Sequence, residues 1–444
     1  MLFDDRRFLC KGIVLVIIIG IAIRLALGYL MSYNYDIYHW ALTISNFEAG
    51  NGLYDTAGYY YTPVWGYILG VFSQVIELFG VDNLGYRFEE LLFTEDLSCI
   101  SPHTAFVTSM GFNMAVAVMM AVFDLITAYL VYWIVKDVFH DANKAKIAFS
   151  IWFLFSFVII VGAIGGMFDC ISAMLLLLMI CLLLKDQELL AGAIFAAAVM
   201  LKMFPGFLFF LLIAYILVKH SDTWKLRMLK AVVGAVAMIG VIMLPQIMDG
   251  TVMDSFSFLT DRASSGTTTG EILVKYASII IYVLIILAEI VLAWLFMKRD
   301  HEDVDRSFII YSFIGMTLVF LTGGAPQYIM PMVPLLIIAT VCVSGRFRIP
   351  MLILMVASSL YMLSPIVMDL AAISVYTDIL SLDSWIGLYN MFDFELAGTN
   401  GFNVWTTIGG ALQGMSLIIL FLAIIVEYRT PLQTLLSKKR KSAE

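Results

Sequence analysis

The sequence has few charged residues, and this shortage determines the class of protein that we expect. Only 14% of the 444 residues are charged, whereas 62% are hydrophobic, and the mean hydropathy is +0.95. A typical soluble domain has about a quarter charged residues. The 26 basic residues are outnumbered by 34 acidic ones, which is the opposite of the basic surface that nucleic acid requires. We therefore expect an all-α polytopic membrane protein that binds no nucleic acid.

Cysteine is also scarce, and nucleotide-binding motifs are missing. The five cysteines include no C-x-x-C pair and no histidine at metal spacing, so neither a disulfide framework nor a zinc site is expected. The sequence has no G-x-x-x-x-G-K-[ST] loop for ATP. The only Asp-x-Asp motif, Asp303-Val304-Asp305, lies in a loop of about ten residues, too short to form a nucleotide-binding domain. An enzyme that uses a nucleotide sugar is therefore disfavoured.

Long apolar runs are abundant, and they predict about twelve transmembrane helices. A span needs about 20 apolar residues. The runs that reach or approach this length are 9–31, 111–135, 145–166, 170–184, 188–203, 205–219, 231–247, 274–297, 307–322, 327–343, 349–368 and 404–426. The first run carries Arg24 and ends without an A-x-A-like cleavage site, so we expect it to be retained as a span.

Basic residues alternate along the chain and predict its orientation. Lysine and arginine remain on the cytoplasmic side. They gather before the first run, in the tail, and in the segments 136–146, 219–230, 298–306 and 344–348. The remaining segments, 32–110, 247–273, 323–326 and 369–403, contain only Arg87 and Arg262 as basic residues, against 18 acidic ones. We therefore expect both termini to be cytoplasmic and these four segments to lie outside.

This orientation requires that residues 61–80 do not cross the membrane. A stripe of small and polar residues on this stretch favours a helix that lies in the interface: Gly66, Gly70, Ser73, Gln74 and Glu77. The alternative is that 61–80 is a span and that 85–110 holds a second one. A shorter amphipathic helix is expected before it, with one apolar face: Ile37, Trp40, Ala41, Ile44 and Phe47.

Four features of the predicted outer side could carry chemistry. They are Asp36, with His39 on the same helical face; Asp169, after the glycines of GAIGGMFD; Lys202, before the break at Pro205; and the Gly/Pro-broken segment GGAPQY, 323–328. Each has a structural alternative. The two acids could cap helices, the lysine could extend to the interface, and the breaks could serve packing. In the spans, Arg24 and Asp124 are expected to pair, because an unpaired charge is costly there.

A membrane transferase with a polyprenyl-phosphate-linked sugar donor fits this small set of charges. Such a reaction needs a carboxylate to take the acceptor proton and cations to hold the departing phosphate. Partial desolvation would raise the pKa of Asp36, which suits a general base. In a proton-coupled transporter the same acid would be a proton or cation site.

At these residues the chain resembles the glycosyltransferase C superfamily. It is most similar to the catalytic subunit of the first mannosyltransferase of GPI-anchor synthesis and to bacterial polyprenyl-phosphate-mannose-dependent mannosyltransferases. The resemblance covers about residues 30–220 and, more faintly, 323–335. The segments that carry it are YNYDIYHW, GLYDTAGYYYTPVWGYIL, FDLITAYLVYWIV, GMFDCISAML, LKMFPGFLFFLLI and GGAPQYIMPMVPLL.

The resemblance implies an inverting transfer of mannose to a lipid- or glycan-linked acceptor on the extracytoplasmic face of the cell membrane. By the resemblance, Asp36 would be the catalytic base, Asp169 the acid of the second outer loop and Lys202 a lysine of the site. Because cations are few on the predicted outer side, we expect Arg262 and His39 to hold the donor phosphate together with Lys202. The candidate substrate-binding residues are Asp169, Tyr59, Tyr61, Gln327 and Tyr328. Asn34 stands where the family often has a second loop acid, and Met167 where it usually has glutamine, so no metal site and no cofactor are indicated.

We expect one domain over residues 1–444, with a catalytic module at 1–220 that includes the outer loop 32–110 and a variable transmembrane module at 221–444. The partners implied are the lipid-linked donor, the acceptor and the bilayer. The alternatives from other classes are a flippase for polyprenyl-linked saccharides, a proton-coupled transporter and a scaffold that stabilises partners. A transporter should show two related halves, and no internal repeat is evident.

Overall fold

The structure is a computed structural model that describes residues 8–441 except 56–58, 60, 82–85, 88–105, 258–268, 322–323, 364–369, 382, 386, 389–394 and 397–398. The described part is almost entirely helical, as the sequence predicts. Its strands are two short antiparallel pairs, β1 (Tyr86–Arg87) with β2 (Phe106–Val107), and β3 (Glu395–Leu396) with β4 (Thr399–Asn400).

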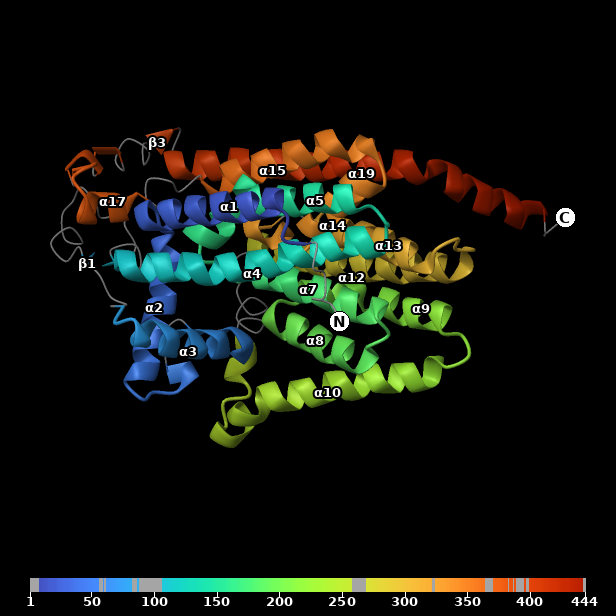
Figure 1. The fold of residues 1–444 in the computed structure, drawn as a ribbon, viewed down its shortest axis with the longest axis horizontal. Coiled ribbons are helices and arrows are strands. Elements are labelled where there is room, and N and C mark those ends of the chain that lie inside the picture. Colours follow the sequence, from blue (N-terminus) through green and yellow to red (C-terminus); the bar gives the residue numbers. More distant parts are fainter. Residues whose placement is uncertain are drawn as a thin grey trace.

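The helices up to the middle of the chain are α1 (Lys11–Leu30), α2 (Asn34–Glu48), η1 (Leu53–Asp55), α3 (Pro63–Leu78), α4 (Met110–Asp137), α5 (Ala142–Leu154), α6 (Ser156–Ile159), η4 (Ile160–Ile164), α7 (Asp169–Leu184), α8 (Glu188–Leu201), η5 (Phe204–Leu208) and α9 (Phe209–Lys219). Those after it are α10 (Trp224–Asp249), η6 (Asp254–Phe256), α12 (Thr269–Lys298), α13 (Val304–Phe320), η7 (Pro326–Ile329), α14 (Val333–Cys342), η8 (Gly345–Phe347), α15 (Arg348–Met362), α17 (Ala371–Tyr376) and α19 (Gly401–Lys441). Most long helices run side by side along the bundle, while α2 lies across one end of it (Figure 1). We call the end with α2, α3 and α17 the pocket end.

Within the described residues, five helical segments are long and apolar enough to cross a membrane: Lys11–Leu30, Met110–Asp137, Trp224–Asp249, Ile279–Lys298 and Thr406–Tyr428. The segments Ala142–Leu154 and Ser156–Ile164 meet at a bend of 46° and would make a sixth span. The expected number of twelve is therefore not confirmed. Several predicted runs form shorter helices; the 16 residues of α7 reach only about 24 Å at 1.5 Å per residue.

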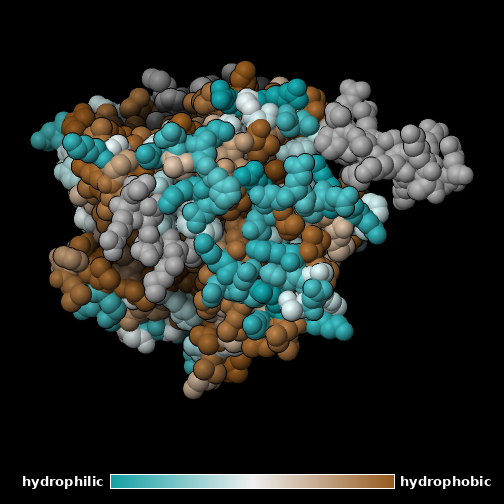
Figure 2. Space-filling model, turned by 45° about the vertical axis from the view of Figure 1, so that its right-hand side comes forward, coloured by the Kyte–Doolittle hydropathy of each residue, from teal (hydrophilic) through white to brown (hydrophobic). Residues whose placement is uncertain are grey.

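Hydrophilic side chains gather over the end of the bundle that faces the viewer in Figure 2, which is the end opposite the pocket, and hydrophobic areas flank them. Ion pairs join the connections between helices at this end. Lys219 lies 3.3 Å from Asp186 and 3.1 Å from Asp305, and Arg227 pairs with Glu188. These contacts link the turn between α7 and α8 to the starts of α10 and α13.

The apolar face predicted for α2 is confirmed. Ile37, Trp40, Ala41 and Ile44 recur at helical spacing and are at most 2% exposed. Burying an aliphatic or aromatic side chain of this size contributes about 1.5–3 kcal/mol. The face therefore fixes α2 against the ends of the bundle helices, and it fixes the direction in which the opposite face points.

The stripe of small and polar residues on α3 is divided between protein contact and the surface. Gly66 and Ser73 are buried, and a Cβ added to Gly66 would lie 2.5 Å from Leu53. Gln74 and Glu77 are exposed, as are the apolar side chains of Val71 (69%) and Leu78 (85%). The exposed side of the helix therefore carries both polar and apolar side chains. Whether α3 lies in the interface or crosses it stays a prediction.

The ion pair predicted between Arg24 and Asp124 is confirmed. Arg24 Nη2 and Nε donate to Asp124 Oδ2 at 2.9 and 3.1 Å, and Nη1 donates to the carbonyl oxygens of Gly20 and Phe153 at 3.2 and 2.8 Å. Both side chains are fully buried. A buried charge needs such compensation, because its desolvation costs several kcal/mol. The pair therefore joins α1 to α4 in the interior of the bundle.

Candidate active site

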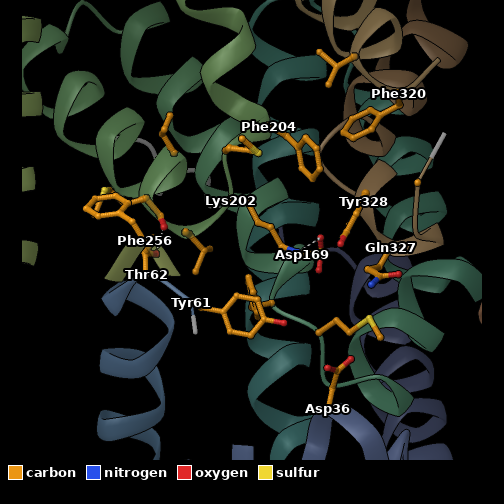
Figure 3. A pocket seen from close by; sticks show the side chains of 18 of the residues that line it. Asp36, Tyr61, Thr62, Asp169, Lys202, Phe204, Phe256, Phe320, Gln327 and Tyr328 are labelled. Atoms are coloured by element: carbon orange, nitrogen blue, oxygen red, sulfur yellow. Dashed lines mark hydrogen bonds and ion pairs between the residues drawn. The ribbon is translucent and has the colours of Figure 1, made fainter. Parts of the chain in front are cut away.

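A cavity of about 410 Å³ opens among elements of the pocket end. Its walls come from α2, the segment before α3, the segment before α7 with the first residue of α7, the end of α8 and the break before η5, and from η5, η6, α12, α13 and η7. Figure 3 shows acids, a lysine and aromatic rings that point toward one another across it. The cavity is therefore lined by segments from both halves of the chain.

Asp36 lies in the first turn of α2 and faces the cavity (Figure 3). It lies at the edge of the buried apolar face of this helix, one turn before Trp40, which lines the same cavity. Burial raises the pKa of its carboxyl to about 7, while the charge of Lys202 lowers this pKa and the charge of Asp169 raises it. The expected upward shift is confirmed. A carboxyl with this pKa is half ionised near neutrality, as a general base requires.

The glycine segment before Asp169 brings α2 and α7 together. Gly166 has a φ of +57°, which favours glycine, and a Cβ there would lie 2.9 Å from Ile37. The carbonyl oxygen of Gly166 accepts a hydrogen bond of 3.0 Å from Trp40 Nε1. We expected these glycines to admit a ligand, but the close neighbour is α2. The contact fixes Asp169, the first residue of α7, relative to Asp36.

Lys202 enters the cavity where α8 ends. Its backbone is extended, with φ −147° and ψ 131°, and Pro205 follows in η5, so the helix stops there. Its Nζ lies 3.2 Å from Asp169 Oδ1, and the two side chains are 15% and 3% exposed. The same atom lies 4.6 Å from the Phe168 ring centroid and 4.7 Å from that of Tyr328. An ion pair and two cation–π contacts thus hold the ammonium group.

Other aromatic residues pack around Phe168, one of the two rings that contact the Lys202 ammonium group. Phe168 stacks on Trp65 at 5.2 Å between ring centroids and meets Tyr61 edge-on at 5.1 Å. Trp40 lies 5.2 Å from Trp65 and 6.0 Å from Phe168. Such pairs contribute about 0.5–1.5 kcal/mol each beyond their burial. This cluster ties α2, α3 and the segment before α7 into one wall.

The segment GGAPQY supplies the facing wall. Gln327 and Tyr328 line the cavity from η7. Gln413 of α19 donates through Nε2 to the carbonyl oxygen of Pro326 at 3.2 Å and to Ser358 Oγ at 3.1 Å. The short helix is therefore held in place by the last helix of the bundle.

The structure brings six of the predicted site residues to this cavity: Asp36, Tyr61, Asp169, Lys202, Gln327 and Tyr328. Tyr59 does not line it. It is buried behind the wall, where its hydroxyl donates to the carbonyl oxygen of Thr62 at 2.9 Å and accepts from the Gly66 amide at 2.7 Å. His39 is not among the lining residues either, and Arg262 lies outside the described residues. Their roles in phosphate binding stay predictions.

Sequence reasoning missed most of the apolar lining: Trp40, Met167, Phe168, Phe204, Phe256, Tyr282 and Phe320. The sequence positions of two of these residues could have indicated that they line the site. Trp40 is one helical turn beyond Asp36, and Phe168 directly precedes Asp169. Met167 lies in the segment before α7, and the remaining four come from α12, α13, η5 and η6, whose approach to α2 depends on the tertiary fold.

Metal-ligating side chains within the described chain come together in Asp186, Glu188 and His220, whose ligand atoms lie within 4.8 Å of one another. This group is at the end of the bundle opposite the cavity. Lys219 and Arg227 already pair with its carboxylates. Their charges compensate the acids, so the group is explained as an ion network.

The arrangement can transfer a proton and can bind an anion. Asp36 offers a carboxyl that titrates near neutrality, Lys202 offers a restrained ammonium group, and aromatic rings surround both. Rings beside polar groups are typical of sugar and lipid-headgroup sites, because one wall can contact apolar faces while the other forms hydrogen bonds.

Comparisons with known proteins identify the family. No curated protein matches the sequence of the chain. The sequence profile of glycosyltransferase family 87 matches residues 101–322, which is half of the 444 residues and includes Asp169 and Lys202. The more specific resemblance to GPI-anchor and bacterial mannosyltransferases is not confirmed by this match. The chain belongs to glycosyltransferase family 87 and is a multi-pass membrane glycosyltransferase.

Proposed function

We propose that this protein transfers a sugar, mannose, from a polyprenyl-phosphate donor to a lipid- or glycan-linked acceptor, with inversion, on the extracytoplasmic face. The observation that carries the proposal is the convergence of Asp36, Asp169 and Lys202 on one cavity. A carboxyl that titrates near neutrality and a restrained cation are the two groups that such a transfer needs.

In the proposed reaction, the acceptor hydroxyl attacks the anomeric carbon from the side opposite the phosphate. A new carbon–oxygen bond forms, and the bond between that carbon and the phosphate oxygen breaks with its electron pair on the phosphate. Asp36 takes the proton of the hydroxyl. Inversion follows from this single displacement in line.

Lys202 stabilises the negative charge that develops on the departing phosphate. Its ammonium group has three N–H donors, so it can bind phosphate oxygens while it forms its ion pair with Asp169. The Phe168 and Tyr328 rings restrain the ammonium group from two sides, so its position is set before the donor binds. Asp169 thus orients Lys202 and can accept a hydrogen bond from a sugar hydroxyl.

The mixed lining of the cavity supports a donor that is polar at one end and apolar at the other. Sugar hydroxyls would meet Gln327 and Asp169, while Phe204, Phe256 and Tyr282 offer apolar surface. The extracytoplasmic assignment rests on the distribution of lysine and arginine, which are almost missing from the segments that carry the pocket-end residues.

Transfer of radiolabelled mannose from polyprenyl-phosphate mannose tests the proposal. The assay uses the purified full-length protein in detergent, where no ion gradient exists. We expect Asp36→Asn to lower the rate by about 10²–10⁴-fold, the usual contribution of a general base. Unimpaired transfer by Asp36→Asn would exclude the role of Asp36, and transport across sealed vesicles without transfer would favour the transporter.

Two further variants test the assignments of Asp36 and Lys202. Lys202→Met should lower turnover because the leaving phosphate loses its counter-charge, whereas Lys202→Arg should retain part of it. Asp55→Asn is a matched control for Asp36→Asn: this carboxylate belongs to the same predicted outer loop, accepts a hydrogen bond from the Gly52 amide and does not line the cavity. It should leave transfer unchanged.

A further inference from the structure

Another buried carboxyl lies away from the cavity, on α12. Glu289 is fully buried, and neither of its carboxylate oxygens has a hydrogen-bond partner in the described structure. The buried positions around it on α12 are apolar and recur at helical spacing: Ile285, Leu292, Ala293 and Phe296. The acid therefore occupies the middle of the stripe that packs against α9 and α13, where a core side chain is expected.

The neighbours of Glu289 leave room for its carboxyl group. A Cβ added to Gly315 of α13 would lie 2.8 Å from Oε2 and 3.1 Å from Oε1 of Glu289, and 2.9 Å from Leu208 of η5. The carboxyl group therefore lies in the notch that the glycine leaves between α12, α13 and η5. The helix η5 follows the break at the end of α8 where Lys202 lies.

Ser312, on α13, is another buried polar residue without a hydrogen-bond partner in the described structure. By contrast, the Thr317 hydroxyl of the same helix donates to the carbonyl oxygen of Phe313 at 2.8 Å. The connection 299–303 joins α12 to α13. Glu289 is nine residues before the end of α12, and Ser312 is eight residues after the start of α13. At 1.5 Å per residue both lie about 12–14 Å from this connection, at the same depth.

No charged group in the described structure compensates Glu289. On the helices packed against it, the charged and titratable side chains are Tyr215 and Lys219 of α9 and Asp305, Arg306 and Tyr311 of α13. The hydrogen bonds of Tyr215 and Lys219 join them to Asp305 at the far end of the bundle. η5 has no such residue, and Tyr282 and Lys298 of α12 lie about two turns away.

An ionised carboxylate in this position would be very costly, so the group is neutral and holds a proton. A metal cation does not suit the site, because it takes about six oxygen ligands, and Glu289 belongs to no group of three or more metal-ligating His, Cys, Asp or Glu side chains among the described residues. The proton is therefore the ligand whose chemistry fits.

We propose that Glu289 is a proton-binding site inside the membrane domain, and that loss of the proton loosens the packing of α12 against α13 and η5. This proposal is independent of the transferase function. Ionisation would place an unpaired charge in the notch beside Gly315, and water or movement of the helices would have to compensate it.

The first experiment labels the full-length protein in membranes with dicyclohexylcarbodiimide, which adds to a protonated carboxyl group in apolar surroundings, and locates the adduct by mass spectrometry. Glu289 should be labelled. Glu188 is the matched control: it is 2% exposed but pairs with Arg227, so it should be ionised and unlabelled. Labelling of Glu188 with none at Glu289 would overturn the proposal.

The second experiment measures thermal unfolding against pH for the wild type, Glu289→Gln and Glu188→Gln. Where the folded protein holds a proton that the unfolded chain releases, the unfolding equilibrium constant rises about tenfold per pH unit. The wild type and Glu188→Gln should therefore lose stability with rising pH more steeply than Glu289→Gln, which keeps only the contribution of other groups such as Asp36. Parallel curves for wild type and Glu289→Gln would contradict the proposal, and if Glu289→Gln does not fold, the labelling result decides.

Discussion

If Asp36 removes the acceptor proton, the rate of transfer must follow the ionisation of its carboxyl group. Burial raises the pKa of Asp36 to about 7. Only the ionised form is a base, so activity should be lost as pH falls through this value. The ionised fraction is about one eleventh at pH 6 and about ten elevenths at pH 8, which predicts an approximately tenfold lower kcat/KM at pH 6. An aspartate with an ordinary pKa of about 3.9 would give no change over this range.

The charged neighbours of Asp36 predict how substitutions should move the midpoint of the pH profile of kcat/KM. The charge of Lys202 lowers the pKa of Asp36 and that of Asp169 raises it. Lys202→Met should therefore move the midpoint to higher pH, and Asp169→Asn to lower pH, whatever each substitution does to the maximal rate. A shift of the midpoint separates an electrostatic effect on the base from a loss of substrate binding.

The assay is the pH dependence of kcat/KM for mannose transfer, with thermal unfolding followed over the same pH values so that loss of folded protein is not mistaken for titration. The kcat/KM of Asp36→Glu should still fall as pH decreases, because this variant keeps a carboxyl group at the position. A wild-type profile that is flat between about pH 6 and 8, while Asp36→Asn is inactive, would refute the assignment of Asp36 as the base.

Three further substitutions test the packing that supports the site. Gly166→Ala should lower both thermal stability and turnover, because its positive φ costs about 1–2 kcal/mol in any L-residue and its methyl group would push α2 away. Arg24→Met should lower the free energy of unfolding by about 3–5 kcal/mol in denaturant titration, because Asp124 would be left buried and unpaired. Adding Asp124→Leu should restore much of this loss. An Arg24→Met variant as stable as the wild type would contradict the argument. Gly234→Ala should lower the melting temperature, because its Cβ would lie 1.9 Å from a carbonyl oxygen of α8, whereas Gly240→Ala, with open space around it, is the control that should not.

Some features of this fold follow directly from the sequence because they depend on local spacing or on the cost of a buried charge. The apolar face of α2 has the period of a helix, and only one face of it could be buried. Arg24 and Asp124 each need a partner inside the spans, and each was the obvious partner of the other. The alternation of basic segments along the chain likewise predicted that Asp36, Asp169 and Lys202 lie on one face of the membrane.

Other features could not be predicted, because they depend on how separate segments meet. Apolar runs such as 170–184 have the composition of spans but form helices shorter than about 20 residues, so composition alone does not decide which of them cross the membrane. The small residues of α3 could equally have faced water or protein, and only the position of Leu53 decides that Gly66 is packed. The ion pair between Lys202 and Asp169 joins the ends of two different helices, and no spacing rule predicts it.

If the donor is the proposed polyprenyl-phosphate sugar, the charges of the site explain how Lys202 can serve both donor binding and catalysis. With Asp36 ionised, the two carboxylates and Lys202 carry a net charge of −1, which opposes the anionic donor; with Asp36 protonated the net charge is zero. The donor should therefore bind more readily when Asp36 is protonated. Once bound, its phosphate adds a negative charge near Asp36 and favours the protonated form further. The ionised carboxyl is then a stronger base while the donor is present, and the developing phosphate charge is held by an ammonium group that Asp169 and two rings already position.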